Sequence, residues 1–412
     1  MSKLEQLITE LCPDGVEYTT FGEVCLPTSN VNWKKENGRY RYIDLTSVER
    51  KTGTISATET ITADIAPSRA QKIVKTDDVI FGTTRPTLKR YCFIPKDYDG
   101  KICSTGYCVL RANKDVIIPR YIFHIVGASS FSNYVEANQK GSAYPAISDI
   151  EVKKFWFPLP PLPVQEEIVR ILDNFTELTA ELTAELTAEL TARKKQYEYY
   201  RDELLAFVDN VPIVTLGDYC EICRGASPRP ISQYITNDSN GVNWIKIGDV
   251  EAGSKYVTKS AQKITQAGAK KSRQVKKGDF ILSNSMSFGR PYILDIDGCI
   301  HDGWIIISEF EQYLISDFLY HLLNSSLVQN YWKQRASAGG SIQNLNSDIV
   351  RATLIPLPPL SEQQRIVGIL DRFDTLCNDI SSRLPTEIEA RQKQYEYYRD
   401  KLLTFPKAEL EV

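Results

Sequence analysis

The sequence contains a long internal duplication, which constrains the fold more than any other feature. Seven residues, Gln-Tyr-Glu-Tyr-Tyr-Arg-Asp, occupy positions 196–202 and recur letter for letter at 394–400, an offset of 198. Pro-Leu-Pro-Pro-Leu at 158–162 recurs at 356–360 with the same offset, so no gap separates the landmarks of the two copies. We therefore expect one architecture built twice, with an internal pseudo-twofold repeat.

The segments between these landmarks, the two heads, resemble each other only in outline. Tyr42-Ile43 corresponds to Trp244-Ile245, and Thr-Phe-Gly-Glu at 20–23 corresponds to Thr-Leu-Gly-Asp at 215–218. Short apolar runs separated by Gly, Asp and Lys turns predict a mixed α/β domain with a curved sheet in each head, closed by helical segments at 119–134 and 316–332. The fold class expected for the chain is α+β. A duplicated scaffold with diverged heads predicts two different ligands held at a fixed separation.

Each head is followed by a segment that is typical of one long helix. Residues 164–207 contain neither Gly nor Pro and are rich in Glu, Leu, Ala, Arg and Lys. Such a helix would be about 64 Å long and needs a partner to bury its apolar stripe. The second copy, at 361–405, is the obvious partner, so we expect an antiparallel coiled coil. Pro385 departs from the pattern and is expected to kink or restart the second helix.

Three tandem copies of Thr-Ala-Glu-Leu fill residues 179–190 of the first helix. Leucines consequently recur every four residues, and this stripe winds slowly round the helix. One interpretation is a ruler, in which each unit changes the spacing of the heads by about 6 Å; the other is a convenient helix filler. The residues expected between the helices are Leu178, Leu182, Leu186, Leu190, Leu376, Ile380 and Leu384.

The net charge of −3 and the pI of 5.9 are unusual for a chain that binds nucleic acid. The acidic excess lies in the helical segments, however, and each head contains slightly more basic than acidic residues. Low overall pI therefore does not exclude DNA binding by the heads. No apolar run approaches the length that crosses a bilayer, and nine scattered cysteines suggest reduced thiols. A cytoplasmic protein is expected.

On these residues the chain resembles the specificity (S) subunits of type I restriction-modification enzymes, in the branch with Thr-Ala-Glu-Leu repeats. The resemblance covers the whole chain and divides it into a target-recognition domain at 1–157, a helical spacer at 158–210, a second target-recognition domain at 211–355 and a second spacer at 356–412. It implies that each head reads one half of a split, asymmetric site in double-stranded DNA. The helices would set the gap between the half-sites.

The resemblance also implies partners. The spacer helices, including Tyr197, Tyr200, Tyr395 and Tyr398, would dock two methyltransferase (M) subunits, and restriction (R) subunits would join them. Adenine-N6 methylation and ATP-dependent cleavage would belong to those partners, with S-adenosylmethionine, ATP and magnesium. No cofactor, metal or catalytic residue is expected in this chain.

Two loops in each head combine Gly with the polar side chains that DNA readout requires. These are 82–91 and 138–144 in the first head, and 283–290 and 334–344 in the second, where a basic run at 263–277 suits phosphates. A solvated surface charge is the competing interpretation of each single Arg or Lys. The candidate DNA-binding residues are Arg85, Lys89, Arg90, Gln139, Lys140, Ser142 and Tyr144 in the first head, and Lys270, Lys271, Arg273, Ser285, Ser287, Arg290, Gln334, Arg335, Ser341, Gln343 and Asn344 in the second.

Several chemical motifs are missing or incomplete. The sequence has no Gly-x-x-x-x-Gly-Lys-Ser/Thr loop and no Asn-Pro-Pro-Tyr-type methyltransferase loop. Cys220 and Cys223 form half of a zinc motif without a second pair. His124 and His321 fall at matching places on apolar helices, as packed, hydrogen-bonded core histidines do. An autonomous DNA-modifying enzyme is therefore disfavoured, and the main alternative is a protein-interaction scaffold in which a coiled coil spaces two heads without reading DNA.

Overall fold

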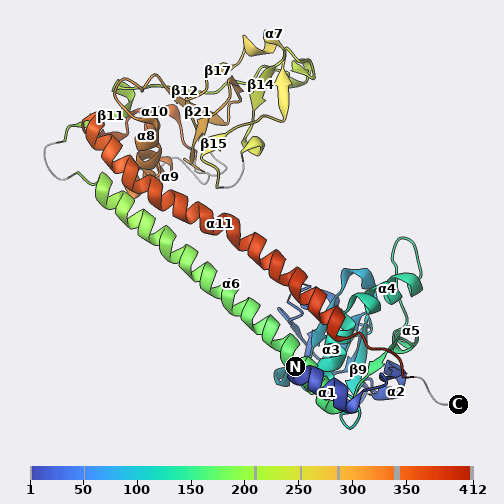
Figure 1. Cartoon of the computed structure of the whole chain (residues 1–412). Helices are drawn as coiled ribbons and strands as arrows, with labels where there is room; N and C mark the ends of the chain where they lie inside the picture. The colour runs from blue at the N-terminus through green and yellow to red at the C-terminus, as the bar shows by residue number, and fades with distance from the viewer. Residues whose placement is uncertain are drawn as a thin grey trace. The chain divides into compact units, whose positions relative to one another are not determined.

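The structure is a computed structural model that describes residues 2–50, 52–207, 211–250, 253–284, 288–337 and 344–408. Two compact units make up the chain: Met1–Glu185 together with Leu384–Val412, and Leu186–Arg383. We call them unit 1 and unit 2. Each contains one head and a part of each of two long helices (Figure 1).

The two long helices are α6 (Leu162–Leu205) and α11 (Leu360–Leu402), close to the predicted limits. The threonines of the repeat fit into α6 because their hydroxyls donate to the carbonyl four residues earlier, as from Thr179 to Phe175 at 2.7 Å. In α11 the helix continues on both sides of Pro385, so of the two expected outcomes the restart is wrong and the kink stays a prediction. The ion pair between Arg391 and Glu387, at 2.8 Å, supports the turn that follows the proline.

In each unit α6 and α11 pack against each other through a stacked aromatic pair. Phe175 of α6 lies on Tyr398 of α11 in unit 1, with ring centroids 5.4 Å apart. In unit 2 the helices exchange roles, because Phe373 of α11 lies on Tyr200 of α6 at 5.3 Å. The predicted helix pair is thereby confirmed, and its contacts follow the internal repeat.

The head of unit 1 contains two four-stranded sheets and short helices. One sheet has the antiparallel order β2-β9-β6-β7, and the other has the order β4-β3-β8-β5, in which β3 and β8 run parallel. The elements are α1 (Lys3–Leu11), β1 (Glu17–Thr20), α2 (Phe21–Val24), β2 (Cys25–Leu26), β3 (Tyr40–Ile43), β4 (Glu59–Ile61), β5 (Ala70–Ile73), β6 (Val79–Gly82), β7 (Tyr91–Phe93), β8 (Ile102–Ser104), β9 (Tyr107–Ala112), α3 (Pro119–Gly127), α4 (Ser129–Asn138), α5 (Asp149–Lys153) and β10 (Trp156–Leu159).

The head of unit 2 repeats this plan with five strands in each sheet, in the orders β12-β21-β18-β19-β15 and β13-β16-β14-β20-β17. Its parallel pair, β14 with β20, corresponds to β3 with β8. The elements are β11 (Ile213–Thr215), β12 (Glu221–Arg224), β13 (Ile235–Thr236), β14 (Val242–Ile245), β15 (Tyr256–Val257), β16 (Gln262–Ile264), α7 (Gln266–Ala269), β17 (Arg273–Val275), β18 (Phe280–Ser283), β19 (Pro291–Leu294), β20 (Gly298–Ile300), β21 (Trp304–Ser308), α8 (Ser316–Leu323), α9 (Ser326–Ser337), α10 (Ser347–Arg351) and β22 (Leu354–Pro356).

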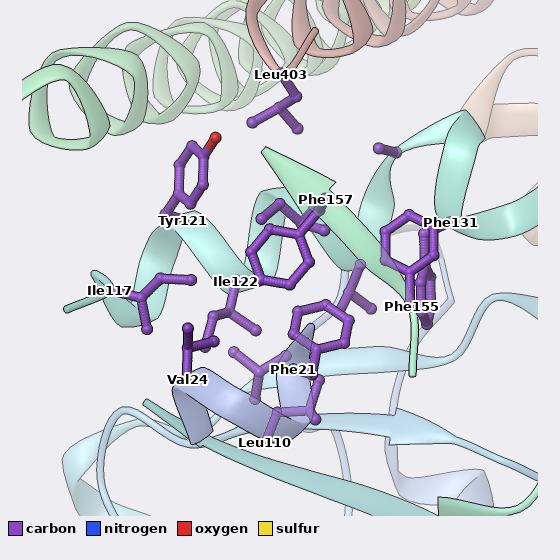
Figure 2. Close-up of a cluster of buried hydrophobic side chains, with 14 of the residues drawn as sticks. Phe21, Val24, Leu110, Ile117, Tyr121, Ile122, Phe131, Phe155, Phe157 and Leu403 are labelled. Atoms are coloured by element: carbon purple, nitrogen blue, oxygen red, sulfur yellow. The ribbon is translucent and has the colours of Figure 1, made fainter. Parts of the chain in front are cut away.

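The core of unit 1 joins its head to the long helices. Phe21 of α2 packs on Phe157 of β10, with ring centroids 4.7 Å apart, and on Phe131 of α4 at 5.9 Å. Leu403, directly after α11, belongs to the same buried cluster (Figure 2). Burial of each such large side chain stabilises the fold by about 1.5–3 kcal/mol. The head therefore shares one hydrophobic core with the helix ends that hold it.

The helical segment predicted at the end of each head consists of two helices. Residues 119–134 divide at Ala128, which is extended between α3 and α4, and residues 316–332 divide between α8 and α9. In both heads the break places a helix start against the long helices. The backbone N–H of Ser129 donates to Asp400 at 3.1 Å, and that of Ser326 donates to Asp202 at 3.0 Å. A carboxylate at a helix start satisfies a free N–H and favours the helix dipole.

Candidate nucleic-acid interface

Three segments of the first head converge on one edge. The backbone N–H of Ile147 donates to the carbonyl of Thr83 at 2.9 Å, and that of Thr83 donates to Gly106 at 2.7 Å. Arg85 donates through its backbone N–H to Pro145 at 2.7 Å. The two predicted loops, 82–91 and 138–144, are thereby joined to each other and to the turn at 104–106.

Arg85 is held in an unusual conformation at this edge. Its guanidinium lies over the ring of Tyr144, 4.7 Å from the centroid, and Tyr144 is 71% exposed. Arg85 and Lys89, which flank the 3₁₀ turn Pro86–Leu88, both have left-handed backbones, with φ of 49° and 51°. Left-handed non-glycine residues carry strain and concentrate at functional sites. The loop therefore presents two cations and an aromatic ring in a defined arrangement.

The other candidates of the first head lie around this pair. Lys89, Lys140 and Ser142 are exposed, whereas Arg90 and Gln139 are partly buried. The carbonyl of Arg90 accepts a hydrogen bond from Gly82 at 2.7 Å, so its backbone holds the loop to β6. The buried Oε1 of Gln139 has no hydrogen-bond partner among the described residues.

The second head has the same convergence. The backbone N–H of Asn284 donates to Gly303 at 3.1 Å, and that of Leu345 donates to the carbonyl of Asn284 at 2.8 Å. Thr83, Gly106 and Ile147 make the corresponding contacts in the first head. The loop after β18, the turn at 301–303 and the segment before α10 therefore meet at one edge.

The candidate DNA-binding residues of the second head differ in exposure and position, and four of them lie outside the described residues. Asn344 is exposed beside Leu345, at the convergence. Gln334 and Arg335 are exposed on α9, and Arg335 lies over the ring of Tyr331 at 5.5 Å. Arg290 is partly buried and lies over Tyr292 at 5.5 Å. The candidates that lie outside the described residues are Ser285, Ser287, Ser341 and Gln343.

The basic run of the second head borders the same edge. Lys270, Lys271 and Arg273 are exposed. Between them the Ser272 hydroxyl donates to the carbonyl of Ala226 at 2.6 Å, and Arg273 pairs with Ile300, the residue before the turn. The run thus adds positive charge next to the convergence, as phosphate binding requires.

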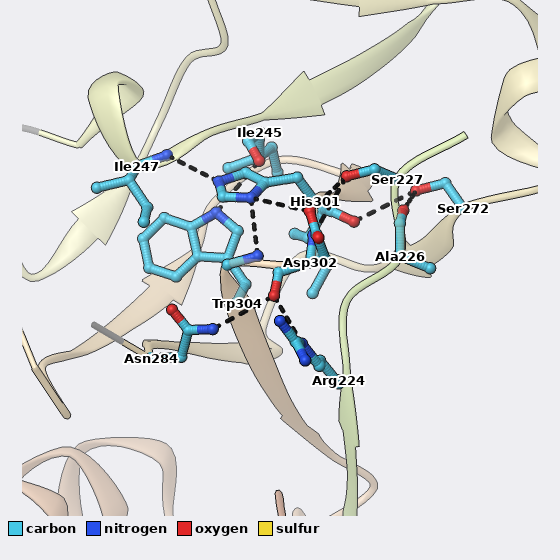
Figure 3. A network of polar contacts seen from close by, with 12 residues as sticks. Arg224, Ala226, Ser227, Ile245, Ile247, Ser272, Asn284, His301, Asp302 and Trp304 are labelled. Atoms are coloured by element: carbon cyan, nitrogen blue, oxygen red, sulfur yellow. Dashed lines mark hydrogen bonds and ion pairs between the residues drawn. The ribbon is translucent and has the colours of Figure 1, made fainter. Parts of the chain in front are cut away.

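Sequence reasoning missed a further group at this edge. Figure 3 shows Arg224, Ser227 and Asn284 gathered around Asp302 in the turn at 301–303. The available signal was the run Arg-Gly-Ala-Ser-Pro-Arg at 224–229, which combines two arginines with Gly, Ser and Pro.

A histidine network fixes the first head to both long helices. His124 of α3 is buried, with its Nε2 2.9 Å from Asp173 of α6 and its Nδ1 3.0 Å from the Tyr395 hydroxyl of α11. Burial lowers the pKa of His124 and outweighs the opposing effect of Asp173. Burial also acts to raise the pKa of Asp173, but hydrogen bonds from His124 and Arg120 lower it to about 2. A neutral imidazole therefore donates to Asp173 and accepts from Tyr395.

The second head repeats this network with the helices exchanged. His321 of α8 lies with its Nε2 3.0 Å from Asp371 of α11 and its Nδ1 2.8 Å from the Tyr197 hydroxyl of α6. The prediction of two packed, hydrogen-bonded histidines is confirmed. Tyr197 and Tyr395 belong to the repeated heptapeptide, as do Asp202 and Asp400 at the helix starts. Its identity in both copies follows from these identical contacts.

The leucine stripe occupies the space between the helices only in part. Leu182, Leu186, Leu190, Ile380 and Leu384 are partly buried, whereas Leu178 and Leu376 are 63% and 49% exposed. The expectation that these two side chains lie between the helices is wrong. A four-residue repeat turns the stripe by about 40° per unit relative to the helix axis, so it leaves the contact. The aromatic pairs with Tyr398 and Tyr200 provide contacts between the two helices instead.

Two features of the described residues bear on other classes of protein. No group of three or more His, Cys, Asp or Glu side chains in that part of the chain is arranged to hold a metal ion. Cys220 and Cys223 are free thiols, and burial raises the pKa of Cys220 to about 12. No described helix combines the length and the apolar character that crossing a membrane requires.

Comparison with known proteins identifies the family. The type I restriction modification DNA specificity domain matches the chain twice, at residues 13–192 and 209–390. The chain therefore belongs to the family of type I restriction-modification specificity subunits. The two matches follow the two copies of the repeat.

Relatives and solved structures agree with this assignment. The EcoR124I/EcoR124II specificity subunit of Escherichia coli is 35% identical over 335 residues, which are 76% of this chain and 78% of the relative. The HsdS subunit from Thermoanaerobacter tengcongensis is similar with a TM-score of 0.63, 27% identity and coverage of 95% of this chain and 97% of that one. A chain from a structure of the type I R-M system gives a TM-score of 0.78 at 27% identity, covering 95% and 98%.

The family defines the class of activity. The chain is a DNA specificity subunit, and it is the non-catalytic component of a type I system. The predicted α+β fold with two similar domains and two long packed helices is confirmed.

Proposed function

We propose that each head reads one half of a split DNA site and that the long helices set the gap between the halves. The observation that carries this proposal is the equivalent convergence of loops in the two heads, with the same backbone contacts and different exposed side chains. Shared backbone contacts would give both heads one way of meeting DNA, and unlike side chains would give them different sequences.

The proposed parts of the chain are target-recognition domains at 1–157 and 211–355 and helical spacers at 158–210 and 356–412. In the first domain Arg85 and Tyr144 are the leading candidates for base contacts, and Lys89 and Lys140 for phosphate contacts. In the second domain Lys270, Lys271 and Arg273 would bind phosphates. This division follows from exposure and charge, since base edges require directed donors and phosphates require only cations.

The partners that we propose are two M subunits and the R subunits that complete the nuclease. Two equivalent exposed tyrosines support the pair of M subunits: Tyr199 on α6 is 63% exposed and Tyr397 on α11 is 62% exposed. Both lie in the repeated heptapeptide, so each unit offers the same aromatic side chain to a protein partner. Such a complex would work in the cytoplasm, where the DNA is.

The test uses the chain in complex with its M partner and a library of random DNA duplexes. Sequencing of methylated adenines should reveal two short specified tracts separated by a gap of fixed length and free sequence. A single continuous motif would contradict reading by two heads. Methylation without any sequence preference, or DNA binding without it, would favour the alternative of a scaffold that only spaces protein partners.

A further inference from the structure

We propose that Arg224, held by the turn at Asp302, reads a guanine in the half-site of the second head. This inference rests on the proposed function and names a residue that determines specificity at that site. The run at 224–229 is the only local sequence signal for Arg224, which lies 78 positions from Asp302 in the turn that holds it.

Asp302 is the centre of a network that orders two arginines (Figure 3). Its carboxylate accepts a hydrogen bond from the Ser227 hydroxyl at 2.7 Å, and its other oxygen lies 3.5 Å from Nη2 of Arg229. Its backbone carbonyl accepts from Nε of Arg224 at 2.8 Å and from Nδ2 of Asn284 at 3.4 Å. The hydrogen bond from Ser227 lowers the pKa of Asp302, so the carboxylate is ionised at neutral pH.

Glycines bring the arginine strand close to this turn. A Cβ added to Gly225 would lie 2.1 Å from the carbonyl oxygen of His301, and one added to Gly303 would lie 2.3 Å from Cε1 of the His301 ring. The ring of His301 in turn accepts a hydrogen bond from the Gly303 N–H at 2.8 Å. A larger residue at position 225 would require movement of the backbone, and one at position 303 would displace the ring of His301. The turn and the start of the segment 224–229 therefore have a defined spacing.

This arrangement leaves the outer part of Arg224 available. The side chain is exposed, and Nε is its hydrogen-bonded atom, so both Nη groups lack a hydrogen-bond partner within the described part of the chain. Two N–H donors of an arginine fork match O6 and N7 of guanine in the major groove. Because Nε is already tethered, less side-chain freedom is lost when the fork binds. Arg229 is held less firmly than Arg224, because its side chain is 83% exposed and lies 3.5 Å from the carboxylate of Asp302.

A base edge is a better target than a phosphate for this group. The ionised carboxylate of Asp302 would repel a phosphate placed beside it, whereas it can accept a hydrogen bond from a cytosine amino group. The corresponding turn of the first head, Ser104 to Gly106, has no carboxylate, and Thr105 donates its N–H to the carbonyl of Arg69 at 2.8 Å. Phosphate contacts serve any sequence and would be expected in both heads. The arginine and its carboxylate-containing turn occur in the second head alone, as expected of residues that distinguish one half-site from the other.

The experiment compares the methylation motif of three complexes with the M partner: the parent chain, Arg224→Ala and Asp302→Asn. In Arg224→Ala one G·C pair of one half-site should lose its preference by about 5- to 150-fold, and the other half-site should be unchanged. Asp302→Asn should relax the same pair by a smaller factor, because the backbone carbonyl that accepts from Arg224 remains and only the ionised carboxylate that orders the turn through Ser227 is lost. Arg224→Lys keeps the charge without the fork and should resemble Arg224→Ala.

Lys270→Ala is the matched control, since it removes an exposed cation of the same head outside the network. It should weaken methylation of all sequences alike and relax no position. If Arg224→Ala also weakens every sequence equally, Arg224 contacts a phosphate and the inference is overturned, while reading by two heads stands. If the parent complex shows no split motif, the proposed function itself fails. Retention of the other specified positions of the second half-site reports that the substituted head is folded, and Arg224→Lys provides the readout if Arg224→Ala is not folded.

Discussion

Each of the two heads buries an aspartate at the same position of the repeat, but the two aspartates have different side-chain partners. Asp78 and Asp279 each precede an inner strand, and each accepts a backbone hydrogen bond at 2.7 Å, from Lys75 and Lys276 respectively. In the first head Arg111 grips Asp78 with two bonds, at 2.9 and 2.7 Å. In the second head the strand position of Arg111 is taken by Ser308, and burial raises the pKa of Asp279. The duplication has kept backbone contacts and let the side-chain partners diverge.

The same rule holds at the proposed DNA edge. The turns at 104–106 and 301–303 accept the same backbone N–H, from Thr83 and from Asn284. Their side chains differ: Ser and Thr stand in the first head where His301 and Asp302 stand in the second. A recognition domain can therefore change the side chains that it presents without changing the backbone contacts that position them.

The largest effect is expected from Arg111→Ala. It would leave Asp78, 1% exposed, without its charged partner, and loss of one member of a buried ion pair costs about 3–5 kcal/mol. Urea unfolding, with hydrogen exchange to locate the change, should report this loss in the first head alone. Ser308→Ala at the equivalent position should change stability by no more than about 0.5 kcal/mol. If Arg111→Ala lowered the free energy of unfolding by less than about 1 kcal/mol, the ion pair that distinguishes the first head would not contribute to its stability.

A smaller loss of stability, equal in the two heads, is expected when the tyrosine–histidine hydrogen bond that both contain is removed. Tyr395→Phe and Tyr197→Phe each remove the hydroxyl that donates to a buried histidine, at His124 and His321. Each should lower the free energy of unfolding by about 1–3 kcal/mol, because a buried acceptor loses its partner. The two losses, measured by urea unfolding, should match within about 0.5 kcal/mol. Unequal losses would mean that the repeated heptapeptide has different tasks in the two units.

The smallest effect concerns Asp279. Its pKa is raised in the folded state, so its contribution to stability is complete below the unfolded pKa, near 3.9, and is lost as pH rises through the folded pKa. Asp279→Asn removes this charge at neutral pH and should modestly stabilise the second head, because burial disfavours the charged carboxylate. Asp78→Asn should destabilise the first head instead. Thermal unfolding at neutral pH checks both variants, and the same sign for both would contradict the comparison.

The helical half of the molecule could be predicted from sequence because its signals are local and repeated. The exact recurrence of seven residues has a structural cause in the tyrosine and aspartate contacts that each head needs. The leucine stripe was less informative, because a four-residue period drifts away from the contact and leaves Leu178 exposed.

The recognition edges could be predicted only as loops. Gly, Arg and Asn in 82–91 and 283–290 indicated where chemistry would lie, and within each head backbone contacts join the loop to a turn and to the segment before the last short helix. Arg224 and Asp302 were missed because their proximity depends on the close approach of Gly225 to His301, residues 76 positions apart in the sequence. Such long-range contacts leave no periodic pattern.

The central claim, that two unlike readers are held a set distance apart, is tested most directly by deleting residues 183–186, one Thr-Ala-Glu-Leu unit, and sequencing the adenines that the complex methylates. The helix loses about 6 Å, so the gap should shorten by about one to two base pairs while both half-site sequences stay the same. Insertion of one unit should lengthen the gap. A changed half-site, or an unchanged gap with full activity, would contradict the claim.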